Sequence, residues 1–131
     1  MPLGIGSTFV NKPTATLSSH LWIIISDTFG SPEKVVIVNL TTWRDKATEL
    51  NDASCIVNIG DHRFVTGKSY ISYFDAKCRE TKALQETLNK GLITLDETCS
   101  GGFLVKILAG AAKSLFTPIK VLQALQDQEL I

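Results

Sequence analysis

The chain has 131 residues, of which 44% are hydrophobic and 20% charged, and its 13 basic residues balance its 13 acidic residues. This length and composition predict one folded domain with its own core and exclude a wholly disordered chain. The charge balance excludes a protein held on nucleic acid by overall positive charge, while a local basic patch stays open.

The N-terminal segment and the cysteines predict a cytoplasmic protein. Residues 1–6 lack the positive charge and the long apolar run of a signal peptide, and the longest apolar run, at residues 21–25, is too short for a membrane span. Cys55, Cys78 and Cys99 are odd in number and have no CxxC spacing, which argues against a disulfide scaffold and a zinc ribbon. We therefore expect no membrane contact, no metal and no cofactor.

The first half of the chain has the pattern of strands, because its apolar residues come in short runs rich in β-branched side chains. Five strands are expected, at residues 7–10, 20–26, 34–41, 54–59 and 69–74. The second run does not alternate, which predicts a strand buried on both faces. Its short Gly/Pro connection to the third run predicts an antiparallel hairpin.

From residue 79 the apolar residues recur at helical spacing. Helices are expected over residues 79–90, which would end at Gly91 as a left-handed cap, and over residues 103–112. A third helix would begin with Thr117 as N-cap and a proline after it. We expect Ile119, Leu122 and Leu125 of this third helix to face inward. Asp96 and Glu97 precede the second helix, and their charges would complement the dipole at its N-terminus.

Together these elements predict a single α+β domain that is mainly β. Residues 6–75 would form a small, strongly bent antiparallel sheet or barrel, with the helices of residues 79–130 packed on it. We expect the last helix, in residues 117–131, to cover the barrel, with dimer formation or partner docking as the alternatives.

Two histidines are the side chains whose ordinary pKa lies near neutrality. His20 opens the second strand and His62 lies in a polar turn, and each has a purely structural alternative. Thr41 and Thr42 end the third strand, where they would either cap the loop or line a site. Trp43 follows them in a polar segment and is a candidate for ligand stacking.

Residues 62–79 carry a local positive charge, with four basic residues against the single acid Asp75. Four aromatic residues are interleaved with these cations, and cations beside aromatic rings can bind single-stranded nucleic acid. At most half of the rings can face outward, because neighbouring strand residues point to opposite faces. The candidate binding residues here are Arg63, Lys68, Ser69 and Tyr70.

The order of these motifs resembles the PemK/MazF-like growth-inhibitor family. The likeness lies in Gly6-Ser7-Thr8-Phe9-Val10, His20-Leu21-Trp22-Ile23-Ile24-Ile25-Ser26, Val36-Ile37-Val38-Asn39-Leu40-Thr41-Thr42, Ser69-Tyr70-Ile71 and the stretch from Gly91 to the Ala-rich segment at residues 109–115. It covers residues 6–116. The resemblance implies an SH3-like barrel that forms homodimers, a cognate antitoxin protein as partner, and metal-independent cleavage of single-stranded RNA by the 2′-hydroxyl.

The resemblance also implies roles for residues. The family's catalytic Thr corresponds to Thr41, and its catalytic Arg corresponds to His20, while Ser7 stands where the family has an acid. The residues themselves suggest a related mechanism, in which His20 and His62 act as acid and base and Arg63 or Lys68 binds the phosphate. This hypothesis requires His20, Thr41 and His62 to converge. A non-enzymatic binding module of the same fold, or a different small β-barrel, is the alternative.

Overall fold

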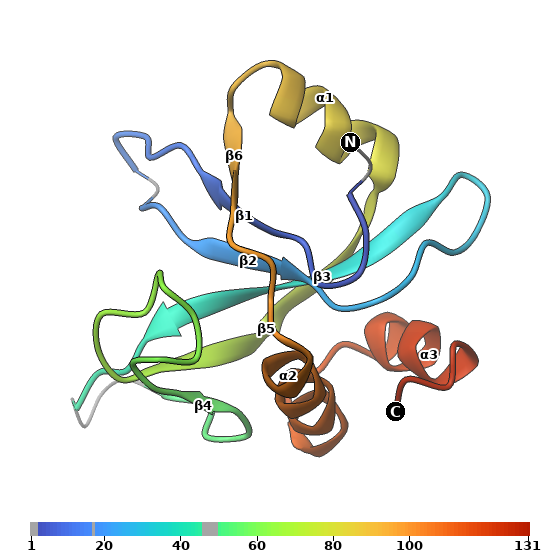
Figure 1. Cartoon of the computed structure of the whole chain (residues 1–131). Coiled ribbons are helices and arrows are strands. Elements are labelled where there is room, and N and C mark those ends of the chain that lie inside the picture. The colour runs from blue at the N-terminus through green and yellow to red at the C-terminus, as the bar shows by residue number, and fades with distance from the viewer. Residues whose placement is uncertain (1–2, 17, 46–49) are drawn as a thin grey trace.

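The computed structural model describes residues 3–16, 18–45 and 50–131, and its six antiparallel strands form one sheet curled into a half-barrel with three helices (Figure 1). The strands are β1 (Thr8–Asn11), β2 (Leu21–Ile24), β3 (Lys34–Thr42), β4 (Ile56–Val57), β5 (Ser69–Glu80) and β6 (Ile93–Asp96), and the helices are α1 (Thr81–Asn89), α2 (Gly101–Lys113) and α3 (Ile119–Asp127). Across the sheet the order is β4-β5-β3-β2-β1-β6. The predicted α+β class and the bent antiparallel sheet are therefore confirmed.

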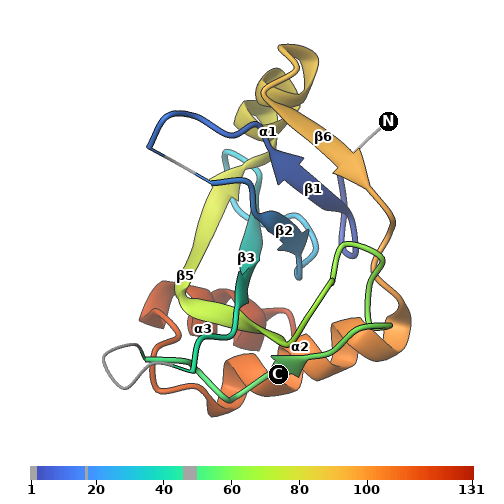
Figure 2. The same cartoon turned by 90° about the vertical axis from the view of Figure 1, so that its left-hand side faces the viewer.

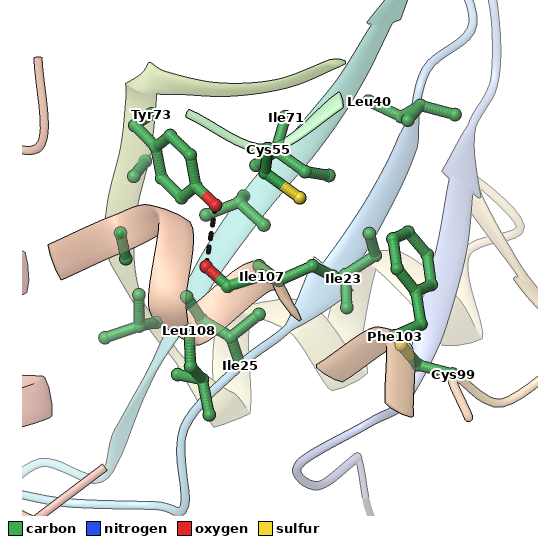
Figure 3. Close-up of a cluster of buried hydrophobic side chains, with 14 of the residues drawn as sticks. Ile23, Ile25, Leu40, Cys55, Ile71, Tyr73, Cys99, Phe103, Ile107 and Leu108 are labelled. Atoms are coloured by element: carbon green, nitrogen blue, oxygen red, sulfur yellow. Dashed lines mark hydrogen bonds between the residues drawn. The ribbon is translucent and has the colours of Figure 1, made fainter. Parts of the chain in front are cut away.

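The sheet has two faces with separate cores, because strand side chains alternate between them. We call one the α2 face: its Ile23 and Tyr73 pack with Phe103 and Ile107 of α2. In Figure 3 the Tyr73 hydroxyl donates a hydrogen bond of 2.6 Å to the Ile107 carbonyl. This larger core also includes residues of α3.

The other face is the α1 face. Its Ile24 and Ile37, which alternate with residues of the α2 face, pack with Leu84 of α1 and Ile93 of β6. Helix α1 lies at one end of the sheet, and α2 and α3 lie toward the other end (Figure 1). The non-alternating apolar run of β2 is thus explained, since both of its faces are covered.

A bulge in β5 changes which residues share a face. Ile37 pairs with Lys77 and Asn39 pairs with Ser72, so two steps along β3 correspond to five along β5. The three additional residues reverse the alternation. Lys77 consequently lies on the same face as Ser72, although five positions separate them.

Two expectations about the elements were incomplete. Strand β6 was not foreseen, and β5 continues to Glu80, where a helix was expected to have begun. Asp96 ends β6, and the N-cap of α2 is Ser100, whose Oγ accepts from the Phe103 N–H at 3.2 Å. Pairing with β1 stabilises β6, and such pairing is not visible in the local sequence.

The start of α3 also differs from the expectation. The N-cap is Pro118, and Thr117 instead donates its hydroxyl to the Ala111 carbonyl at 2.8 Å. Ile119 is 72% exposed, whereas Val121, Ala124 and Leu125 are buried. Of the three side chains expected to face inward, Leu125 is therefore buried as predicted and Leu122 is half-buried, whereas the expectation for Ile119 is wrong.

Two further expectations are confirmed, one for the end of α1 and one for the position of α3. Gly91 has a φ of 73° just after α1, as a left-handed cap requires. Helix α3 covers part of β5 and β3. The three cysteines are free thiols. Within the described ranges, no helix has both the length and the apolar character needed to cross a membrane.

Candidate functional site

Part of the α1 face is polar, and we call this part the polar surface. It begins where the apolar cover of α1 ends, and its side chains come from three neighbouring strands and the residue before β2. Its members are His20, Trp22, Asn39, Thr41, Tyr70, Ser72, Lys77 and Arg79. Asn39 and Ser72 are buried, whereas the other six side chains are half-buried or exposed and can meet a ligand, which makes this surface the first candidate site.

Asn11 of β1 positions two of these residues. Its Oδ1 accepts from the His20 backbone N–H at 2.8 Å and from the Trp22 indole N–H at 3.3 Å. Its side-chain amide donates to the Ser18 carbonyl at 3.1 Å, which links the loop between β1 and β2 to the same residue. Asn11 therefore holds the indole and the start of β2 together.

His20 and Thr41 come together, as the sequence predicted. Trp22 pairs with Asn39, so extending the β2–β3 register by two residues places His20 opposite Thr41. The His20 ring is half-buried, and its Nδ1 lies 3.2 Å from the Leu40 carbonyl. A carbonyl only accepts, so the hydrogen of the neutral ring is on Nδ1 and Nε2 is left as the basic nitrogen.

A hollow of about 210 Å³ lies between this surface and α1. Its walls include Lys77 and Arg79 of β5, Trp22 of β2 and His20 just before β2, and no acidic residue of the described chain lines it. The Lys77 ammonium lies 4.9 Å from the centre of the Trp22 ring. The hollow therefore combines two basic side chains with an aromatic ring, an arrangement that suits an anionic aromatic ligand.

A second cluster extends the polar surface past Thr41. Lys68 Nζ lies 4.0 Å from the centre of the Trp43 ring, and the Trp43 and Tyr70 rings meet edge to face with centroids 6.0 Å apart. Tyr70 pairs with Thr41 across β5 and β3. Three of the predicted binding residues thus lie together beside the predicted catalytic threonine.

His62 lies elsewhere, in a buried position. Its Nδ1 accepts from the Phe64 N–H at 3.1 Å, so Nε2 carries the hydrogen and donates to the Glu97 carbonyl at 2.6 Å. Thr8 at the start of β1 donates to that same carbonyl at 2.6 Å, whereas His20 is bonded to Asn11 at the end of β1. The two imidazoles are at opposite ends of a strand, and the convergence that the two-histidine mechanism requires does not occur.

Arg63 also belongs to this second region, which links the segment after β4 to β6. Its guanidinium donates to the Asp96 carboxylate at 2.6 Å. Partial burial opposes the charge of Asp96, but the hydrogen bonds from Arg63 and from the Glu97 N–H outweigh it and lower the pKa of the carboxyl. In Figure 2 the loop between β4 and β5 reaches toward β6, so Arg63 closes the open side of the half-barrel.

Two further predicted residues point away from the polar surface. Thr42 is exposed and pairs with Ser69, whose buried hydroxyl donates to the Gly67 carbonyl at 3.0 Å. Both alternate with Thr41 and Tyr70, so they lie on the opposite face. Of the nine residues proposed from the sequence, the structure brings together His20, Thr41, Trp43, Lys68 and Tyr70.

Five members of the polar surface were not selected from the sequence: Trp22, Asn39, Ser72, Lys77 and Arg79. Lys77 and Arg79 fell within the charged run of residues 62–79, and Trp22 within a strand expected to be buried on both faces. The face that Lys77 and Arg79 share with Ser72 depends on the β5 bulge, which has no local signature. The available signal was the alternation of cations with Ala76 and Cys78, the pattern of a strand with one solvated face.

The described ranges contain no group of three or more His, Cys, Asp or Glu side chains placed to hold a metal ion. Comparison of the chain with protein families, with curated proteins and with solved structures finds no match. The function is therefore inferred from the geometry of the polar surface and from its residues.

Proposed function

We propose that the protein binds single-stranded RNA on the polar surface. The observation that carries this proposal is the interleaving of Lys77 and Arg79 with Trp22 around a hollow whose described walls contain no acid. Phosphates need cations, and unpaired bases need ring faces on which to stack. A double-stranded helix would not present its base faces, so the ligand is a single strand.

The Trp43 cluster lengthens this surface. Trp43 and Tyr70 add rings and Lys68 adds a cation on the far side of Thr41. A strand that crosses from the α1 hollow to Trp43 would pass the hydroxyl of Thr41 and the Nε2 of His20. Base stacking and phosphate contacts would then alternate along β3, with little discrimination between sequences.

The binding test is the salt dependence of RNA affinity. Fluorescence anisotropy with a labelled 12-nucleotide RNA in chelator should show binding that the double substitution Lys77→Gln and Arg79→Gln weakens at least tenfold. Loss of two phosphate contacts should reduce the slope of log affinity against log salt by about 1.4, at roughly 0.7 per contact. Lys113→Gln, which removes an exposed cation from α2, is the control.

The result has three informative outcomes. Equal weakening by the control variant would mean that charge alone holds the RNA and would overturn the assignment to this surface. Tighter binding of single-stranded DNA than of RNA would overturn the choice of RNA, but the polar surface would remain the binding site. No binding of the wild-type chain would overturn both.

A second candidate function is cleavage of that RNA, favoured by the position of His20 opposite Thr41. Attack of a 2′-hydroxyl on the phosphodiester needs a base for the hydroxyl and a cation for the phosphate. His20 Nε2 would take the proton, and Arg79 and Lys77 would stabilise the charge that develops on the phosphate. The proton returns to the 5′-oxygen as it leaves, and the remaining product ends in a 2′,3′-cyclic phosphate.

Cleavage is distinguished from binding by rate. In chelator, His20→Ala should reduce the appearance of cyclic phosphate at least a hundredfold, since general base catalysis contributes about 10²–10⁴-fold, and should leave RNA affinity within about threefold. Intact RNA after prolonged incubation with the wild-type protein would leave the binding module as the function. A PemK/MazF-like toxin with an SH3-like barrel, a homodimer and an antitoxin partner remains part of this second proposal.

A further inference from the structure

A second, larger hollow lies on the other side of the sheet, and of the polar-surface residues only Lys77 also lines it. It measures about 880 Å³ and lies between α3 and the paired strands β3 and β5. Ligand pockets for small organic molecules span roughly 300–1,000 Å³. Its apolar lining comes from Phe29, Ala76, Val121 and Ala124, and we call it the α3 pocket.

The charged groups of the α3 pocket are mostly basic. Lys34 and Lys120 line it and both act on the thiol of Cys78, whose pKa is raised by burial and drawn down by these two ammonium groups. Lys34 Nζ lies 3.4 Å from the Pro32 carbonyl, and within the described ranges neither ammonium forms an ion pair. Two cations that are not ion-paired within the described ranges therefore act on one thiol.

The other charged groups do not neutralise this pair. Lys77 contributes to the pocket wall, but its ammonium lies over the Trp22 ring on the α1 face. Asp127 also lines the pocket, seven residues after Lys120 and thus about two turns along α3. The charged side chains that line the pocket are thus three lysines and one aspartate, over an apolar floor.

We propose that the α3 pocket binds a small amphipathic anion, a molecule with one carboxylate or phosphate group and an apolar body. The anionic group would lie between Lys34 and Lys120, beside Cys78. The apolar body would lie on Phe29, Val121 and the other floor residues, and its burial would supply most of the affinity. The pocket shares only Lys77 with the polar surface, and the proposed anion site is formed by Lys34 and Lys120, so this proposal does not depend on RNA binding.

The first test compares three probes that share a ten-carbon chain and differ in the head group. Isothermal titration calorimetry should show that decanoate binds at least tenfold more tightly than decanol, and that decyltrimethylammonium binds more weakly than both. Equal affinity for the three probes would reduce the pocket to a site of apolar adsorption and overturn the proposal.

The second test locates the site on the folded protein. Lys34→Met and Lys120→Met should each lower decanoate affinity at least threefold and leave decanol affinity unchanged, while Lys82→Met on α1 changes neither. Decanoate should also slow alkylation of the half-buried Cys78, with the buried Cys55 and Cys99 as internal standards. Undiminished alkylation at saturating decanoate would show that the ligand binds elsewhere, and it would overturn the assignment even if a lysine variant unfolded.

Discussion

The two faces of the same strands differ in composition and in what they can do. On the α2 face, Ile23 and Val38 are fully buried. On the α1 face, their neighbours Trp22 and Asn39 pair beside cations and hydroxyls. Adjacent residues of one strand point to different faces. A residue that stabilises the core of the α2 face can therefore be followed directly by one that lies on the polar surface. Substitutions in the core of the α2 face should therefore change stability more than RNA binding, and substitutions on the polar surface should change RNA binding more than stability.

The largest expected effect is on the α2 face, at Gly110 of α2. A methyl group there would overlap the Tyr73 hydroxyl and crowd Cys55 and the Ser54 carbonyl, which belong to backbone and core that cannot move freely. Gly110→Ala should lower the free energy of unfolding by about 3 kcal/mol, the upper part of the range for overpacking. Urea unfolding followed by circular dichroism measures it.

Gly102→Ala in the same helix is the matched control, because a methyl group at Gly102 would meet open space. It should raise stability by up to about 1 kcal/mol through helix propensity. If Gly110→Ala were as stable as the wild type, the close packing of α2 on Tyr73 would be wrong.

A smaller effect is expected where the open side of the half-barrel is closed. The pKa of Asp96 is below its ordinary value of 3.8, so its ion pair with Arg63 contributes stability above that value, and the contribution is lost as the pH falls through the lowered pKa. Asp96→Asn should reduce stability at pH 7 by less than Gly110→Ala does. It should also flatten the loss of stability between pH 5 and pH 2, measured by thermal unfolding.

Glu86→Gln, at an exposed position of α1, is the control for this pH series and should follow the wild-type curve. A wild-type curve as flat as that of Asp96→Asn would contradict the role of the ion pair with Arg63. RNA affinity at pH 7 should be the same for all three proteins, since this ion pair is distant from the polar surface.

The smallest effect on stability, and the sharpest contrast between the faces, is expected at Thr41 and Thr42. Neither is fully buried, so the alanine variants should each change the free energy of unfolding by about 0.5 kcal/mol or less. Thr41→Ala should weaken RNA binding or, if the protein cleaves, slow cleavage, while Thr42→Ala should match the wild type. If the two variants bound or cleaved RNA equally well, the assignment of Thr41 and Thr42 to opposite faces of the sheet would be contradicted.

Much of the fold was predictable from local pattern. The apolar runs located β1, β2, β3 and the start of β5, and the three-to-four spacing located the helices. Strand β6 was missed because Ile93-Thr-Leu-Asp96 is short and lies next to a glycine turn, which led us to assign it to the entry of a helix. Its pairing with β1 joins residues more than 80 positions apart, and such contacts leave no local pattern.

The candidate site was predictable only in part. His20, Thr41 and Tyr70 were chosen by their positions on strands, and register brought them together. His62 was chosen for its pKa range, but both of its ring nitrogens are bonded in a buried segment. The local sequence around a histidine in a polar turn does not show whether its ring nitrogens are exposed to solvent or bonded to the backbone.

The sequence by itself determined the order and type of most elements, since hydrophobic period acts over a few residues and does not depend on distant contacts. The tertiary structure alone decided which face each cation occupies. Ser72 and Lys77 share a face because β5 takes five steps where β3 takes two, and only the pairing of the two strands creates that mismatch. The polar surface is thus a product of register, which is set by packing across the whole sheet.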